Sequence, residues 1–196
     1  MSSPWNRGIL ELATKKLITS ISVMIKRDHI EISDLINLTD ISLGLHLELK
    51  NNNPKKEIIH QITLFEKKFK RLPSHLDSHR HLHLNESILT EVATVAKDYN
   101  LPVRSLFAEK RNLLKKNKIK TPDDYIDWHP DQKNKLFENL TQSTSTVIEL
   151  VCHPGYFDKN CDYIYNKNRK KELEILKSQT FKKIINRFKL INYSQI

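Results

Sequence analysis

Histidines at the ends of predicted strands are the residues of this chain best suited to chemistry. Of the nine histidines, His46 lies near the end of a predicted strand at residues 41–49, and His153 directly follows one at residues 146–152. A further group lies within and after a short predicted strand: His75, His79, His81 and His83. The carboxyl ends of parallel strands meet at one rim of an α/β fold, where ligands collect. We therefore expect imidazoles from three strand ends to share one site.

Imidazole suits two tasks that the hydrolysis of an amide requires. A neutral ring nitrogen is a common ligand of divalent transition metals, and a carboxylate such as Asp77 can orient the other nitrogen. A bound divalent ion polarises a carbonyl and lowers the pKa of bound water toward neutrality. A further histidine can then protonate the leaving nitrogen. The group from His75 to His83 favours a metal or catalytic role, whereas His46 taken alone is more often a buried structural histidine, and His153 taken alone is ambiguous.

The glycines support this choice of segments. Two of the three glycines in the chain, Gly44 and Gly155, lie two residues from His46 and His153. A chain with so few glycines is expected to keep them where the backbone turns or approaches another group closely. The remaining candidates are weaker: His29, His60 and His129 are expected at the surface.

Helices and strands are predicted to alternate, which favours a parallel sheet with right-handed crossovers. Helices are expected at residues 4–17, 32–38, 55–70, 85–98, 133–141 and 169–188. Strands are expected at residues 18–25, 41–49, 72–78, 103–107, 146–152 and 190–193. Residues 110–131 are polar and poorly patterned, so no element is predicted there. The pattern alone leaves an open sheet and a closed barrel equally possible.

Composition restricts the classes of protein to consider. The length of 196 residues predicts a single domain over residues 1–196. The net charge is +10, but the lysines and arginines are scattered over the polar faces of predicted helices, which favours a solvated surface over a nucleic-acid interface. The two cysteines, Cys152 and Cys161, form neither a disulfide framework nor a Cys-x-x-Cys metal motif. Without an apolar leader or a stretch of about 18 apolar residues, the chain is expected to be cytoplasmic, with no membrane partner.

Three segments, in this order, resemble the YdjC-like carbohydrate deacetylases. They are Leu43-Gly44-Leu45-His46-Leu47, the run from Pro73 to His83 with its His-x-Asp-Ser-His-x-His-x-His spacing, and Glu149-Leu150-Val151-Cys152-His153-Pro154-Gly155-Tyr156. Arg104 and residues 169–178 also look like family positions. The likeness covers nearly the whole chain, and the histidine-rich run carries most of its specificity.

The resemblance implies a TIM-like (β/α) barrel that hydrolyses the N-acetyl group of acetylated amino sugars or chitooligosaccharides. It also implies a divalent metal ion, usually Mg²⁺, bound by an aspartate and two histidines. Carried over to this sequence, the metal ligands are His46 and His79, and His153 is the catalytic proton donor. Ligand chemistry alone suggests Zn²⁺ or Mn²⁺ as readily as Mg²⁺.

The resemblance also suggests supporting residues and partners. The residues expected to bind the substrate or to orient the ligands are Asp77, His81, His83 and Arg104. An acetylated carbohydrate is the expected partner, a homodimer is left open, and a nucleic-acid partner is not expected.

Two departures from the family pattern bear on activity. The segment between His46 and Asp77 is shorter than in many relatives, which predicts a reduced loop over the substrate.

The family opens with a strand carrying Asn-Ala-Asp-Asp-Phe-Gly, which supplies the third ligand and the base, whereas the residues from Met1 onward resemble the stretch after that motif. Our hypothesis is that Met1 is an internal methionine with an in-frame Asp-Asp-Phe-Gly upstream; a stop codon directly ahead of it would refute this. The expected barrel is therefore distorted and lacks its first strand, and a catalytically impaired sugar-binding remnant is the alternative function.

Overall fold

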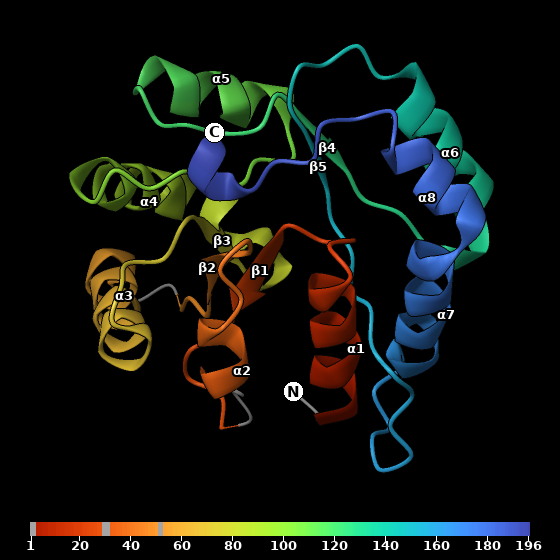
Figure 1. The fold of residues 1–196 in the computed structure, drawn as a ribbon. Helices are drawn as coiled ribbons and strands as arrows, with labels where there is room; N and C mark the ends of the chain where they lie inside the picture. The colour runs from red at the N-terminus through yellow and green to blue at the C-terminus, as the bar shows by residue number, and fades with distance from the viewer. Residues whose placement is uncertain (1–2, 29–31, 51–52) are drawn as a thin grey trace. The chain divides into compact units, whose positions relative to one another are not determined.

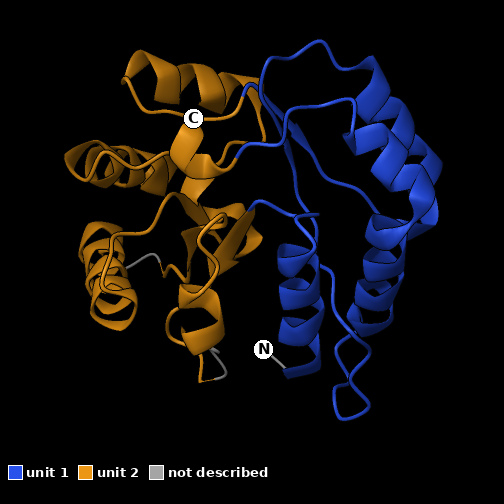
Figure 2. Cartoon of the chain, in the orientation of Figure 1, with its two compact units in different colours: residues 1–19, 123–191 blue, residues 20–122, 192–196 orange. Residues whose placement is uncertain are grey.

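The computed structural model describes residues 3–28, 32–50 and 53–196. The fold is α/β with parallel strand pairs, which confirms the predicted class (Figure 1). The chain divides into two compact units (Figure 2): unit 1 comprises residues 1–19 and 123–191, and unit 2 comprises residues 20–122 and 192–196. Of the surface histidines predicted above, His60 and His129 are exposed and His29 lies outside the described residues.

Unit 2 is built on a three-stranded parallel sheet. The strands are β1 (Ser20–Val23), β2 (Ser42–Leu47) and β3 (Leu76–Ser78), in that order across the sheet. The register places His46 beside Asp77 on neighbouring strands. The apolar residues of β2 are all buried, as expected for a central parallel strand that is covered on both faces.

Helices of unit 2 pack around this sheet: α2 (Ile32–Ile36), α3 (Pro54–Phe69), α4 (Glu86–Asp98) and α5 (Ala108–Lys116). The Asn53 side chain caps α3 by accepting the Lys56 N–H, and Pro54 occupies the first turn, where its missing N–H costs nothing. The buried face of α3 repeats at helical spacing through Ile58, Ile62, Phe65 and Phe69. This helix also holds the end of β2, because the Gln61 amide accepts the Glu48 N–H and donates to the Glu48 carbonyl.

Unit 1 has a two-stranded parallel sheet, β4 (Asp124–Ile126) with β5 (Ile148–Leu150). Its helices are α1 (Ser3–Thr14), α6 (Lys133–Gln142), α7 (Asn166–Lys177) and α8 (Gln179–Ile185), together with a 3-10 turn, η2 (Pro130–Gln132). One apolar cluster joins these elements: Leu12, Ile126, Leu136, Leu140, Leu173, Leu176, Phe181 and Ile185.

Several local predictions differ from the structure. Residues 110–131, where no element was predicted, contain most of α5, all of β4 and the start of a 3-10 turn. The strand expected at residues 103–107 is reduced to a single bridge between Leu76 and Val103. Residues 190–193 form no strand; a capping box on Asn192 instead starts a 3-10 turn, η3 (Tyr193–Gln195). The helix expected at residues 169–188 breaks at Ser178, whose side chain caps α8 by accepting the Phe181 N–H.

The described part of the chain contains two open sheets and no closed one. Within the same residues, no helix combines the length and the apolar character that crossing a bilayer requires.

Candidate active site

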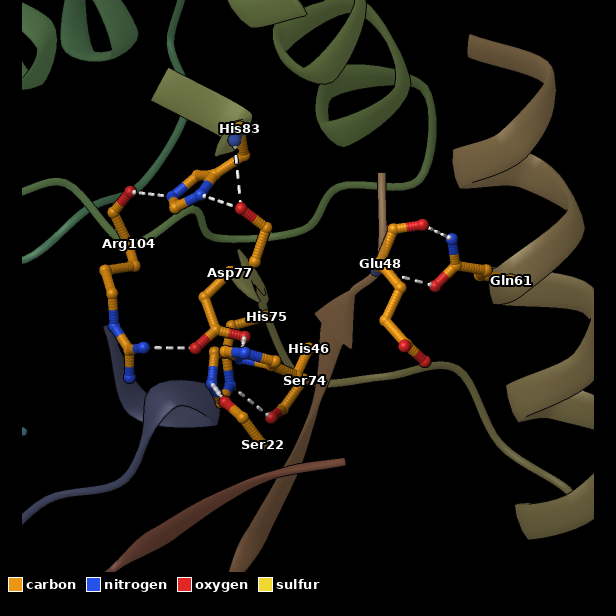
Figure 3. A network of polar contacts seen from close by, with 10 residues as sticks. Ser22, His46, Glu48, Gln61, Ser74, His75, Asp77, His83 and Arg104 are labelled. Atoms are coloured by element: carbon orange, nitrogen blue, oxygen red, sulfur yellow. Dashed lines mark hydrogen bonds and ion pairs between the residues drawn. The ribbon is translucent and has the colours of Figure 1, made fainter. Parts of the chain in front are cut away.

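His46 and Asp77 form the centre of the polar network in unit 2 (Figure 3). They face one another from β2 and β3, with His46 Nδ1 3.1 Å from Asp77 Oδ1. A nitrogen beside a carboxylate carries the proton, so the lone pair of the neutral ring lies on Nε2. Asp77 thus fixes the tautomer that His46 needs to act as a ligand through Nε2.

His79 lies next to His46, directly after β3. The two ring centroids are 6.0 Å apart with the rings at 74°. With metal–nitrogen bonds of about 2.0–2.1 Å, two imidazole centroids on one ion are about 4.5–5.2 Å apart at octahedral or tetrahedral angles and about 6.4 Å apart when the ligands are opposite. The observed separation lies in the upper part of this range. Partial burial, followed by the neighbouring His46, lowers the pKa of His79, which favours the neutral form that binds metals.

A left-handed turn separates the histidines after β3. Arg80 and His81 have φ of 54° and 56°, a conformation that residues other than glycine rarely adopt. Two such residues in succession indicate local strain, which persists only where the surrounding structure holds it. The turn sends His83 into the interior, while His79 is exposed beside His46.

Asp77 is completely buried, and its charge is compensated on two sides. Arg104 donates to Oδ2 in an ion pair, and His46 faces Oδ1. Burial alone would raise the pKa of Asp77, but Arg104 and His46 outweigh it and hold the pKa well below its usual range. Asp77 is therefore a carboxylate at neutral pH.

His83 positions Arg104 rather than facing an open site. Its Nε2 lies 3.0 Å from the Arg104 carbonyl and its Nδ1 2.8 Å from the Ser78 hydroxyl. The carbonyl accepts only, so Nε2 carries the proton and Nδ1 accepts from Ser78. Burial lowers the pKa of His83 to about 4, so the ring is neutral at pH 7.

His75 is also structural. Its ring is buried between the hydroxyls of Ser22 and Ser74 and stacks on Tyr193, with centroids 3.8 Å apart. Burial lowers its pKa to about 3. The ring lies against Gly44, where a Cβ would come closer than 3.0 Å to three ring atoms. Gly44 thus makes the close approach that was expected from the small number of glycines in the chain.

The residues around His46 and His79 fit a metal ion only in part. Their donor set is two neutral imidazoles with a carboxylate behind one of them, as in many catalytic metal sites. Across residues 3–28, 32–50 and 53–196, no three His, Cys, Asp or Glu side chains gather as a complete metal-binding group. His46 and His79 could therefore supply two ligands, and the other positions would be taken by water or substrate oxygen.

His153 lies in unit 1, three residues after the end of β5, and its backbone N–H and carbonyl are both held by side chains of α7. The His153 N–H donates to Glu172 Oε2 at 2.5 Å, and Arg169 Nη1 donates to the His153 carbonyl at 3.2 Å. Glu172 is buried and also accepts the Tyr165 hydroxyl. Burial raises the pKa of Glu172, while Tyr165, the His153 N–H and Arg169 act in the opposite direction. The His153 ring meets Tyr165 edge-on, with centroids 6.0 Å apart.

Sequence reasoning missed several residues around His153. Asp127, Trp128, Tyr163 and Tyr165 line the same cavity as His153 and Arg169, and His129 lines it from the polar segment after β4. The sequence signal for this cavity was a pair of aromatic residues, Tyr163 and Tyr165, shortly after His153-Pro154-Gly155. Of the other predicted residues, Arg104 contacts both Asp77, through its guanidinium, and His83, through its carbonyl. His81 is half-buried and lies beside His83, with ring centroids 6.3 Å apart.

Comparison with known proteins finds a matching family and several similar sequences. Residues 52–187 match the sequence model of a family described as YdjC-like protein. A carbohydrate deacetylase of Clostridium beijerinckii is 28% identical over 240 aligned positions, covering 100% of this chain and 96% of that protein. A chitooligosaccharide deacetylase of Yersinia enterocolitica is 28% identical over 164 positions, covering 75% of this chain and 62% of that protein.

A solved structure has the same fold. It is the crystal structure of a proposed cellobiose-phosphate cleavage protein from Enterococcus faecalis, which matches with a TM-score of 0.79 at 23% identity. The match covers 99% of this chain and 94% of that one.

Proposed function

The chain belongs to the YdjC-like protein family, and from this premise we propose that it hydrolyses the N-acetyl group of acetylated amino sugars or chitooligosaccharides with the help of a divalent metal ion. The observation that carries the proposal is the pair of imidazoles, His46 and His79, of which one is oriented by a buried carboxylate. The names of the Clostridium and Yersinia relatives support the carbohydrate substrate.

In this proposal the metal is held by His46 Nε2 and His79, and Asp77 keeps the His46 ring in the required tautomer and orientation. Arg104 neutralises Asp77, and His83 holds the Arg104 backbone. A bound divalent ion would polarise the acetamide carbonyl and lower the pKa of water. Family resemblance favours Mg²⁺, whereas imidazole ligands also suit Zn²⁺ and Mn²⁺.

His153 is the proposed proton donor to the departing amine. A leaving nitrogen must be protonated before an amine can depart, and imidazole titrates near neutral pH. The contacts of Glu172 and Arg169 with its backbone would hold the donor in place. His81 is the remaining candidate for substrate contact in the histidine-rich segment.

Architecture and location are proposed on separate grounds. The parallel pairing of β1, β2 and β3 supports a distorted (β/α) barrel, although the described sheets are themselves open. The two cysteines are unbridged, which supports a reducing, cytoplasmic location.

A catalytically impaired sugar-binding protein is the second candidate. The observation in its favour is that the described residues offer only two ligands, His46 and His79, and no third His, Cys, Asp or Glu in one group with them. Such a protein would bind acetylated sugars without releasing acetate.

Metal binding and acetate release test the proposal and separate the two candidates. Titration of the metal-free full chain with Mg²⁺, Mn²⁺ and Zn²⁺ should show binding that His79→Ala weakens roughly 100-fold or more, because even partners behind a ligand are worth about 10–100-fold. His60→Ala, an exposed histidine on α3, is the matched control and should bind like the wild type. Acetate release from chitooligosaccharides should require the ion; release that survives EDTA, or equal metal affinity of His79→Ala and wild type, would contradict the proposal.

A further inference from the structure

Unit 1 contains an open cavity of about 410 Å³ beside His153. Aromatic side chains form much of its wall: Trp128, Tyr163 and Tyr165. Pockets for small molecules have volumes of about 300–1,000 Å³ and combine aromatic walls with a few polar groups. The cavity is therefore of a size to take a small ligand or one ring of a longer one.

The aromatic walls are held by their polar ends. Trp128 Nε1 donates to the Val151 carbonyl at 3.0 Å, and the ring packs against the apolar cluster of unit 1. The Tyr165 hydroxyl donates to the buried Glu172. With the indole N–H and the phenol O–H already bonded, these rings offer the cavity mainly their apolar carbon surface.

The third aromatic residue is more accessible. Tyr163 is 53% exposed, and its ring lies 5.9 Å from the ring of Trp5. Trp5 also lies under the Arg169 guanidinium, which is 4.2 Å from the indole centroid. Tyr163 thus stands at the rim of the cavity, next to a cation fixed by stacking.

The charges around the cavity favour a neutral ligand. Asp127 supplies a negative group and Arg169 a positive one, and Arg169 is further tied to the His153 carbonyl. A cavity for a phosphate or nucleic acid would be lined by one sign of charge. A pyranose ring has the matching character, because its C–H face packs on aromatic carbon and its hydroxyl rim bonds to polar groups.

We propose that this cavity is a subsite for one pyranose ring of a neutral saccharide, which packs on Trp128 and Tyr163 and directs hydroxyls to Asp127, with the ring next to His153. The identity of the sugar rests on the proposed function. Occupancy of the subsite needs neither a metal ion nor turnover, so it can be measured by itself.

The test is calorimetric titration of the full chain with N,N′-diacetylchitobiose at pH 7 in the presence of EDTA. Tyr163→Ala should weaken binding about tenfold and Trp128→Ala by at least as much, as expected for aromatic anchors of a binding site. Trp128→Phe, which keeps an aromatic face, should recover most of the affinity. Phe157→Ala is the matched control, because Phe157 is 43% exposed in the same loop and does not line the cavity.

The outcomes separate this subsite from the proposed catalysis. Binding that falls in Tyr163→Ala and Trp128→Ala but not in Phe157→Ala supports the subsite, even if no acetate is released. Absence of binding by the wild type, or equal affinity of all variants, overturns it. If acetate is released with an unchanged KM in Tyr163→Ala and Trp128→Ala, the proposed function stands and the subsite is refuted.

Discussion

The contact between Gly44 and His75 gives the sharpest prediction about the fold that positions His46. In Gly44→Ala, the new methyl would lie closer than 3.0 Å to three atoms of the His75 ring, so the ring must leave its place. Leaving breaks the contacts with the hydroxyls of Ser22 and Ser74, each worth about 1 kcal/mol. It also breaks the stack on Tyr193, worth about 1 kcal/mol. The expected loss is about 3 kcal/mol, the upper end of the usual cost of overpacking a core, and a large share of the stability of about 5–15 kcal/mol typical of a domain.

A double-mutant cycle provides the assay. Urea denaturation followed by circular dichroism gives the free energy of unfolding of the wild type, Gly44→Ala, His75→Ala and the double variant. Removing the ring leaves room for the methyl, so the double variant should be no less stable than His75→Ala, which is a favourable coupling of about 2–3 kcal/mol. Losses that simply add in the double variant would refute the reasoning, because they would mean that the methyl and the ring do not compete for the same space.

Two further predictions concern unit 1. Glu172→Gln should lower the free energy of unfolding by about 2 kcal/mol in urea denaturation. The Tyr165 hydroxyl donates to one carboxylate oxygen and the His153 N–H to the other, whereas an amide replaces one of these acceptors by an NH2 donor. Glu174→Gln, exposed on the same helix, should change the free energy little, and equal losses in both variants would contradict the role of Glu172. Hydrogen bonds from Lys15, then Lys177 and Tyr156, lower the pKa of Glu11 from 4.5 to about 2, so the stability that Glu11 contributes is present above pH 4.5 and is lost as the pH falls toward 2. After screening by solvent, Glu11→Gln should cost about 1 kcal/mol at pH 7, and the difference from the wild type should shrink in denaturation curves recorded at pH 3; a difference that stays constant with pH would exclude this cause.

Local sequence signals predicted the elements that have strong periodicity and caps. The helix expected at residues 55–70 from its apolar spacing was confirmed as α3 (Pro54–Phe69), within one residue at each end. His46 lies one residue before the end of β2, as expected, whereas β5 ends at Leu150, three residues before His153. The expectation that Gly44 and Gly155 make close approaches was confirmed. The helix could be predicted because its signal lies in residues that are neighbours in sequence. The close approaches could be predicted because glycine is the residue type that permits them.

The different roles within the histidine-rich segment could not be predicted from its spacing. Alternation along a strand would place His75, His79, His81 and His83 on related faces, but the left-handed turn at Arg80 and His81 breaks that relation. The turn directs His83 to the Arg104 carbonyl and leaves His79 next to His46. The partner of His83, residue 104, is distant in sequence, so no local pattern announces this contact.

The segment after α5 was unpredictable for a similar reason. Strand β4 is only three residues long, and its backbone is satisfied by pairing with β5 rather than by any local pattern. Trp128 lies two residues after this strand, and its indole N–H donates a hydrogen bond to the Val151 carbonyl. A short strand whose partner lies more than twenty residues away leaves no periodic signal. The cavity residues Asp127, Trp128 and His129 therefore fell in a stretch with the composition of a polar loop.

Asp77 shows why metal binding and turnover are separate questions for this chain. Arg104 donates a hydrogen bond to Oδ2, His46 Nδ1 lies 3.1 Å from Oδ1, and the side chain is fully buried. A general base must reach the proton that it removes, and a carboxylate held between two partners with a pKa well below its usual range is a poor proton acceptor. Asp77 therefore orients His46 and cannot also be the base. Metal affinity depends on that orientation, whereas turnover depends in addition on a different, accessible base, so a variant can lose acetate release while its metal affinity is unchanged.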